Sequence, residues 1–136
     1  MARTVLVVED NEANRALLRD ILTHRGYEVI EAVNGEEGVR TAAERLPDII
    51  LMDMQMPVMN GFKAIELIKN DPRTAHINIV AVTSFAMAVD RRKVMASGAD
   101  EYISKPFDTR ELPRIIERLL APPLGGGREV YNVKDD

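Results

Sequence analysis

The sequence lacks cysteine altogether among its 136 residues. A disulfide scaffold is therefore excluded, and the absence fits a reducing compartment. No apolar run reaches the roughly 18 residues of a membrane span, and the opening MARTVLVVED has no long apolar signal segment. Net charge is −4, and no basic tract is longer than Arg91, Arg92 and Lys93. These absences predict a soluble, cytoplasmic protein that does not bind membranes or contact nucleic acid directly.

The composition is that of an ordinary globular chain, with 46% hydrophobic and 29% charged residues. Its length fits one domain, which we place at residues 1–120. The remaining segment, APPLGGGREVYNVKDD, is interrupted by two prolines and three glycines. We therefore predict a flexible C-terminal tail at residues 121–136, too short for a DNA-binding output domain. A domain cut from a longer protein would look much the same.

Two hydrophobic periodicities alternate along the chain. Short apolar or β-branched runs predict five strands, at residues 4–8, 28–32, 48–52, 77–82 and 101–104. Helical patterns follow each of them, at residues 13–22, 34–46, 62–69, 86–96 and 109–120. In the last helix, Asp108 and Glu111 suggest a capping box, but Pro113 should shift the helix start towards Glu111. The alternation predicts βαβ units, hence a doubly wound α/β fold with helices on both faces of a parallel sheet.

Chemically active side chains follow the ends of four of these strands. Glu9 and Asp10 end the first, Asp53 the third, Thr83 the fourth and Lys105 the fifth. Ligands of such sheets bind beyond the carboxyl ends of the strands, so these side chains should meet there. Clustered carboxylates repel one another unless a cation neutralises them, and oxygen ligands suit Mg²⁺. Asp53 is then a candidate nucleophile forming an aspartyl phosphate, assisted by Lys105 and Thr83.

Four motifs in order carry a family resemblance: VLVVEDN, PDIILMDMQMPVMNG, VAVTS and GADEYISKP. Over residues 3–120 the chain resembles the receiver domain of two-component response regulators. The resemblance implies a flavodoxin-like fold, with a five-stranded parallel sheet in the order 2-1-3-4-5 and five helices. The segments VVEDNE, HINIVAVTSFAM and EYISKPF are similar to a stand-alone cell-cycle regulator of that family.

The resemblance also implies a role for each site residue. Asp53 matches the phosphoacceptor, and Asp10, Asp53 and the backbone carbonyl of Gln55 match the Mg²⁺ ligands. Glu9 matches the first acid of the pair, which is often Asp in the family, so the longer Glu9 is expected to reach the metal through water.

A second group of matches concerns the switch. Thr83 and Lys105 match the switch hydroxyl and lysine, Pro106 the cis proline after them, and Tyr102 the aromatic that moves inward on phosphorylation. The output surface implied is the face built from the fourth helix, the fifth strand and the fifth helix.

The residues two beyond the acceptor and two beyond the switch threonine are Gln55 and Phe85. In the family they flank the approach of the hydrolytic water. Gln55 is able to orient a water, whereas Phe85 offers no hydrogen bond and its ring can cover the phosphate. We expect exclusion of water to prevail, and hence slow decay of the phosphoryl group.

Two enzyme classes fit less well. A haloacid-dehalogenase-type phosphatase needs a second Asp two residues after its nucleophile, where this chain has Gln55. A dinucleotide-binding enzyme needs G-x-G-x-x-G after the first strand, where this chain has EDNEAN. The prediction is therefore a response regulator and not an enzyme that turns over a free substrate. It takes phosphate from a sensor histidine kinase or phosphotransfer protein and acts on a protein partner, as a monomer or phosphorylation-dependent dimer. A phosphorelay intermediate and a fragment of a longer regulator remain alternatives.

Overall fold

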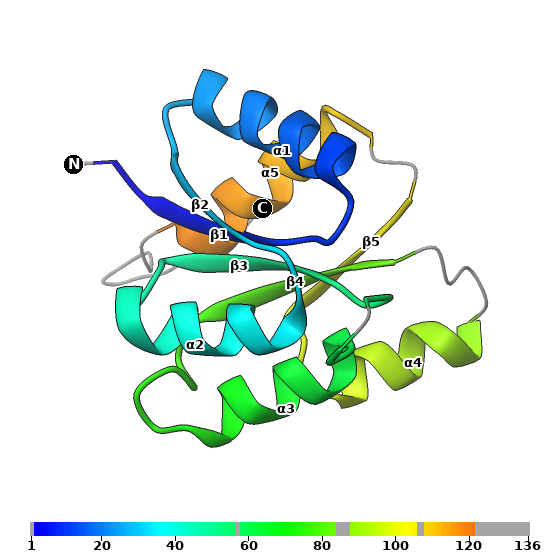
Figure 1. Cartoon of the computed structure of the whole chain (residues 1–136). Coiled ribbons are helices and arrows are strands. Elements are labelled where there is room, and N and C mark those ends of the chain that lie inside the picture. Colours follow the sequence, from blue (N-terminus) through cyan, green and yellow to red (C-terminus); the bar gives the residue numbers. More distant parts are fainter. Residues whose placement is uncertain (1, 57, 84–87, 106–107, 122–136) are drawn as a thin grey trace.

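The computed structural model describes residues 2–56, 58–83, 88–105 and 108–121 (Figure 1). Within them, strands and helices alternate along the chain. The strands are β1 (Thr4–Val8), β2 (Glu28–Ala32), β3 (Ile49–Asp53), β4 (Asn78–Thr83) and β5 (Glu101–Ser104). The helices are α1 (Glu12–His24), α2 (Gly35–Arg45), α3 (Gly61–Asn70), α4 (Ala88–Ala96) and α5 (Glu111–Leu120). Phe85, Pro106 and the predicted tail beyond Ala121 lie outside the described residues.

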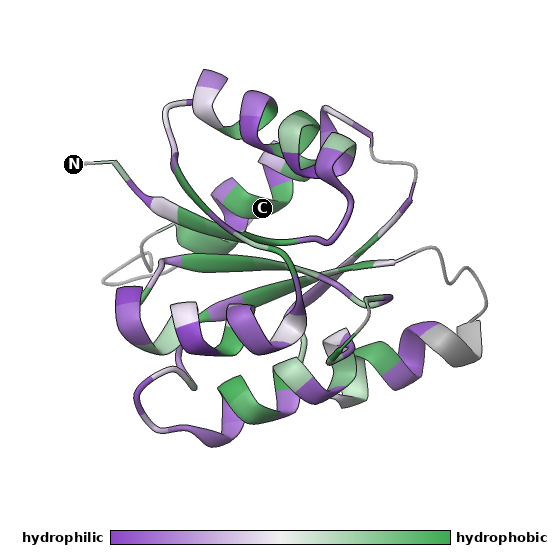
Figure 2. Ribbon diagram, in the orientation of Figure 1, coloured by the Kyte–Doolittle hydropathy of each residue, from purple (hydrophilic) through white to green (hydrophobic). Residues whose placement is uncertain are grey.

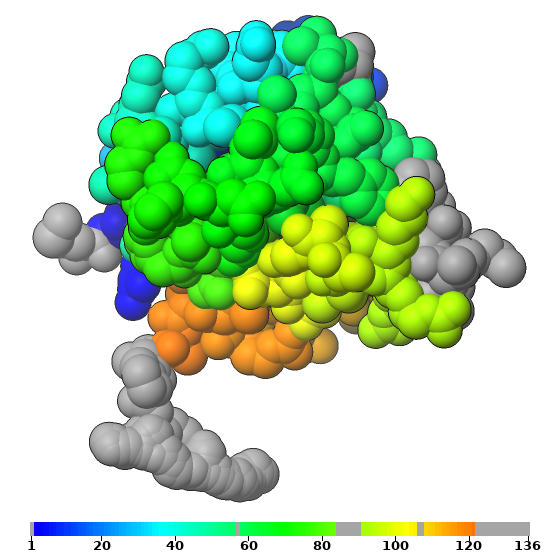
Figure 3. Space-filling model, turned by 90° about the horizontal axis from the view of Figure 1, so that it is seen from below, coloured from blue at the N-terminus to red at the C-terminus, as the bar shows by residue number. Residues whose placement is uncertain are grey.

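The five strands form one parallel sheet in the order β2-β1-β3-β4-β5. Helices α1 and α5 cover one face, and α2, α3 and α4 cover the other (Figure 1). Seen from below, α2, α3 and α4 lie next to one another across their face (Figure 3). The predicted doubly wound fold and strand order are confirmed.

The apolar runs of the strands follow from burial on both faces of the sheet. Successive residues of β1 alternate between two cores: Leu6 and Val8 face α2, α3 and α4, while Val5 and Val7 face α1 and α5. Hydrophobic residues accordingly fill the strands, and polar residues gather on the outer sides of the helices (Figure 2). A parallel sheet covered on both sides requires this near-continuous hydrophobicity, and each fully buried Val, Leu or Ile contributes about 1.5–3 kcal/mol.

Two strands begin one residue later than the sequence pattern predicts. Asp48 precedes β3 because its carboxylate accepts a 2.7 Å hydrogen bond from the backbone N–H of Thr4. Ile77 precedes β4 because its N–H donates to the carbonyl of Thr74, closing a turn at 3.0 Å. Both strands also end one residue later than predicted, so Asp53 and Thr83 are their last residues.

The ends of α2 and α5 show which of the predicted capping residues form caps. Asn34 caps α2 as predicted, accepting from the N–H of Glu37 at 2.8 Å. Helix α5 begins at Glu111, so that Pro113 occupies its third position, where no intrahelical donor is needed. Asp108 was expected as its N-cap, but Arg110 holds that place. The Asp108 carboxylate accepts from the N–H of Arg110 at 2.8 Å and more weakly from that of Glu111 at 3.4 Å, forming the turn before the helix.

Candidate functional site

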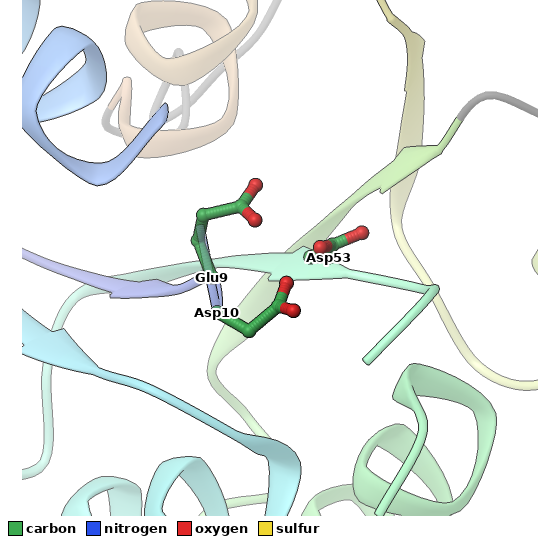
Figure 4. A group of neighbouring side chains, drawn as sticks. All are labelled: Glu9, Asp10 and Asp53. Carbon is green, nitrogen blue, oxygen red and sulfur yellow. The ribbon is translucent and has the colours of Figure 1, made fainter. Parts of the chain in front are cut away.

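Three carboxylates meet beyond the carboxyl ends of β1 and β3. The two strands pair directly, so Glu9 and Asp10, which follow β1, reach the level of Asp53 at the end of β3. One oxygen from each residue lies within 4.8 Å of the other two, and the side chains gather in the same space (Figure 4). Glu9 and Asp53 are each only 2% exposed, whereas Asp10 is exposed to solvent. The predicted clustering of these acids is therefore present.

The start of α1 fixes the turn that presents Glu9 and Asp10. Asn11 caps the helix by accepting from the N–H of Asn14 at 2.9 Å. Its own N–H donates to Glu9 Oε2 at 3.1 Å, and the N–H of Glu9 donates to the carbonyl of Ala32 in β2 at 3.0 Å. Glu9 is thus held from both sides, whereas Asp10 is exposed to solvent.

Asp53 is held by the loop that follows it and by close packing of α3. The N–H of Gln55 donates to Asp53 Oδ1 at 3.1 Å. The first residue of α3, Gly61, lies so close that a Cβ there would come within 2.7 Å of the Asp53 carbonyl oxygen and 2.6 Å of Met54 Cα. Glycine is required here by proximity, since backbone atoms cannot move aside as a side chain can.

Lys105 is the cation that faces the cluster. It follows β5, and its Nζ lies 3.4 Å from Glu9 Oε1 and 3.4 Å from Asp53 Oδ1. The N–H of Lys105 donates to the carbonyl of Thr83 at 2.7 Å, which joins the ends of β4 and β5. The cluster has three carboxylates, and Lys105 lies against two of them, so acidic groups outnumber this cation.

The electrostatic consequence is strongest at Glu9. Burial raises the pKa of its carboxyl from 4.5 to about 7, and the neighbouring Asp53 adds to the rise. The hydrogen bond from the Asn11 N–H and the charge of Lys105 oppose it without cancelling it. Within the described structure, Glu9 Oε1 is buried and has no hydrogen-bond partner, because the Lys105 contact is an ion pair without hydrogen-bond geometry.

These features fit a divalent cation. A buried carboxylate oxygen lacking a hydrogen bond and an excess of negative charge are what bound Mg²⁺ would satisfy. Glu9, Asp10 and Asp53 could hold the ion with their carboxylates. Gln55, whose backbone carbonyl was predicted as the third protein ligand, lies two residues after Asp53 and is exposed.

The predicted switch residues lie on neighbouring strands. Thr83 ends β4 and is completely buried, opposite Ser104 of β5. Tyr102 is half-buried; its hydroxyl accepts a 3.4 Å hydrogen bond from Ser104 Oγ, and the Arg91 guanidinium lies 5.7 Å from its ring centroid. The inward movement of Tyr102 remains a prediction, as do the roles of Phe85 and Pro106.

One residue that touches this site was missed by sequence reasoning. Arg15 donates to the backbone carbonyls of both Glu9 and Asp10. Backbone carbonyls occur at every residue, so a side chain that binds them produces no sequence motif. The one signal that could have indicated Arg15 is its position in the first turn of the helix that follows the acids.

No helix in the described parts of the chain is long and apolar enough to cross a membrane. The parallel sheet, its strand order and the acidic cluster beyond β1 and β3 define a receiver-type fold and site. The chain belongs to the response regulator receiver domain family, whose model matches residues 5–117. Receiver domains of this family are signalling modules.

Known proteins similar to the chain include regulators and receiver domains of kinases. The polar-differentiation response regulator DivK of Brucella anthropi is 42% identical over 119 residues, which are 88% of this chain and 94% of the relative. The receiver domain of the sensor histidine kinase PA1611 from Pseudomonas aeruginosa, crystallised with magnesium in its active site cleft, is 33% identical. Its TM-score is 0.84, with 90% of this chain and 100% of that chain covered.

A third relative was solved together with its partner. It is the receiver domain of the Saccharomyces cerevisiae response regulator Ssk1, in complex with the histidine phosphotransfer protein Ypd1. It is 30% identical, with a TM-score of 0.81 over 87% of this chain and 88% of that chain.

Proposed function

We propose that this protein is a response regulator that accepts a phosphoryl group on Asp53, with Mg²⁺, and then binds a protein partner. The observation that carries the proposal is the cluster of Glu9, Asp10 and Asp53, of which Glu9 and Asp53 are buried, facing Lys105. The donor is the phosphohistidine of a sensor kinase or phosphotransfer protein. The Ypd1–Ssk1 complex supports this class of donor, and the magnesium in the PA1611 receiver supports the metal.

In the transfer, an Asp53 carboxylate oxygen attacks the phosphorus and the bond from phosphorus to the histidine nitrogen breaks. The leaving imidazole regains a proton from solvent. The Gln55 N–H and Lys105 orient the acceptor carboxylate, and Lys105 also faces the charge that develops on the phosphoryl oxygens. When bound, Mg²⁺ would neutralise the carboxylates and the phosphoryl oxygens together. This is a self-catalysed transfer rather than turnover of a free substrate.

The output follows as a shift between two conformations. A phosphoryl group on Asp53 would draw the Thr83 hydroxyl towards it, and Tyr102 would fill the vacated space. The face of α4, β5 and α5 is already hollowed by a groove of about 740 Å³. Its lining includes Arg91, Glu101, Tyr102, Arg110, Arg114 and Arg118. We place the downstream protein at this groove, with the regulator a monomer or a phosphorylation-dependent dimer in the cytoplasm. Onward transfer as a phosphorelay intermediate is the alternative outcome.

The experiment is intact-mass detection of phosphorylation by acetyl phosphate in the presence of Mg²⁺. Wild type should gain one phosphoryl group, while Asp53→Asn and wild type with excess chelator should gain none. Circular dichroism should show that the variant is folded. Labelling of folded Asp53→Asn at the wild-type yield would refute the acceptor assignment, and labelling without divalent metal would refute the role of the acidic cluster.

A further inference from the structure

Arg15 joins three elements behind the acidic turn. From the first turn of α1, its Nη1 donates to the carbonyl of Glu9 at 3.0 Å and to the carbonyl of Asp10 at 3.2 Å. Its Nε donates to Glu31 Oε1 of β2 at 3.3 Å. The Arg15 side chain is only 16% exposed; its contacts with Glu9 and Glu31 are partly buried, whereas its contact with Asp10 is exposed.

The geometry makes use of the shape of the guanidinium group. A planar fork with fixed donors can hold two acceptors and a carboxylate at once, whereas an ammonium is a single point on a flexible stem. Glu31 anchors the far side of the fork, and its second oxygen pairs with Arg19 Nη1 at 2.9 Å. The pairing with Glu31 therefore fixes the orientation of the Arg15 guanidinium, which points Nη1 at the carbonyls of Glu9 and Asp10.

The two carbonyls that it holds belong to the residues that carry two of the three acids. The peptide planes on either side of a residue set the direction of its Cα–Cβ bond. Fixing the carbonyls of Glu9 and Asp10 therefore restricts where their carboxylates can point, in a place where the three acids repel one another.

We propose that Arg15 is a positioning residue of the metal site: it holds the backbone of Glu9 and Asp10 so that their carboxylates face Asp53 before the metal binds. The proposal rests on the proposed function, because it concerns the same site. Groups that orient metal ligands from behind typically contribute about 10- to 100-fold in affinity.

The test compares Arg15→Ala, Arg15→Lys and the matched control Arg19→Ala. Arg19 shares the Glu31 partner and the charge but touches neither carbonyl. Magnesium dissociation constants are measured by titration calorimetry. Amide exchange of Asp10 and Asn11 is measured by NMR in metal-free protein, and urea unfolding gives the stability of each variant.

Arg15→Ala should weaken Mg²⁺ binding about tenfold and speed exchange at Asp10 and Asn11, with phosphorylation recovering at saturating Mg²⁺. Arg15→Lys keeps the charge but not the fork, so its affinity should lie between those of wild type and Arg15→Ala. Arg19→Ala should stay within about twofold of wild type.

Wild-type affinity and exchange in Arg15→Ala would overturn the proposal, as would equal weakening in Arg19→Ala. Full recovery in Arg15→Lys would show that charge alone acts and would also overturn it. If Arg15→Ala does not fold, the lysine variant decides. If wild type itself binds no Mg²⁺, the proposed function fails, and the exchange measurement on metal-free protein still decides whether Arg15 holds the turn.

Discussion

Two charged clusters lie at opposite ends of the same sheet, and they are built in opposite ways. At the amino ends of β4 and β5, Lys69 Nζ donates to the carbonyls of Ala75 and Ile77 at 3.2 and 2.8 Å and to Asp100 Oδ2 at 3.0 Å. The same oxygen accepts from the N–H of Ile79 at 2.8 Å. All three ammonium protons are therefore used, and the cluster ties α3 to the turn before β5.

The cluster at the carboxyl ends is left unbalanced. In the described part of the chain, Lys105 pairs with Glu9 and Asp53 of the three carboxylates, and a buried oxygen of Glu9 lacks a hydrogen bond. A cluster whose charges and hydrogen bonds are all paired stabilises the fold. A cluster with unpaired groups lowers stability, but those groups are free to bind a ligand. The comparison indicates that the two lysines have different tasks, one structural and one chemical.

Replacing each lysine with alanine tests whether one is structural and the other chemical, and it has the largest expected effect. Lys105→Ala removes the cation facing the acceptor, so the initial rate of labelling by acetyl phosphate should fall about 100-fold. Lys69→Ala leaves two carbonyls without their donor, so it should lower the free energy of unfolding by about 1–3 kcal/mol and keep labelling within about twofold of wild type. Equal rates in the two variants would remove the distinction.

The pH dependence of stability should show the strain at Glu9. Its pKa is raised from 4.5 to about 7 in the folded protein, so its contribution is fully present below the lower value and is lost as pH rises through the upper one. Between about pH 5 and about pH 8, metal-free wild type should lose about 2 kcal/mol relative to Glu9→Gln. Urea unfolding with a chelator measures this difference. Added Mg²⁺ should restore wild type at the higher pH, and parallel curves for the two proteins would contradict the assignment.

The lifetime of the phosphoryl group tests whether water can reach Asp53 at the carboxyl ends of the strands. Phe85→Glu replaces a ring that can exclude water with a group that can orient it. Decay of phosphorylated protein should quicken about tenfold, which corresponds to about 1.4 kcal/mol of barrier. The lifetimes of wild type and variant are compared at fixed Mg²⁺ and pH, with Phe62→Glu, on α3, as a control for added charge. An unchanged or longer lifetime in Phe85→Glu would show that Phe85 does not limit hydrolysis.

The smallest expected effect is on the free energy of unfolding, which two matched substitutions, one in each cluster, should change in opposite directions. Asp100→Asn weakens a satisfied, partly exposed ion pair and should cost about 1 kcal/mol of stability. Asp53→Asn removes one of the mutually repelling acids and should leave metal-free protein as stable as wild type or more so. Urea unfolding in the presence of chelator measures both. A larger loss from Asp53→Asn than from Asp100→Asn would mean that the acidic cluster is not strained.

Sequence patterns predicted a parallel sheet and the convergence of the acids, because both follow from burial and from parallel strands ending at one edge. The strand order was predicted from the family resemblance. The start of β3 was misplaced by one residue because Asp48 bonds to Thr4, a contact 44 positions away that no local pattern reveals. The N-cap of α5 was misassigned because the Asp108 carboxylate bonds most closely to the N–H of Arg110, in the turn before the helix. Arg15 was missed because its acceptors are main-chain carbonyls.

The most direct test of the central claim is chemical mapping of the phosphoryl group. Protein labelled with acetyl phosphate and Mg²⁺ is treated with borohydride, which reduces an aspartyl phosphate to homoserine, and its tryptic peptides are sequenced by mass spectrometry. The peptide from Leu46 to Lys63 contains both Asp48 and Asp53, and its fragments separate the two. Homoserine at position 53 alone is the predicted result. Homoserine at Asp10 or Asp48, or none in folded protein that binds Mg²⁺, would contradict the account.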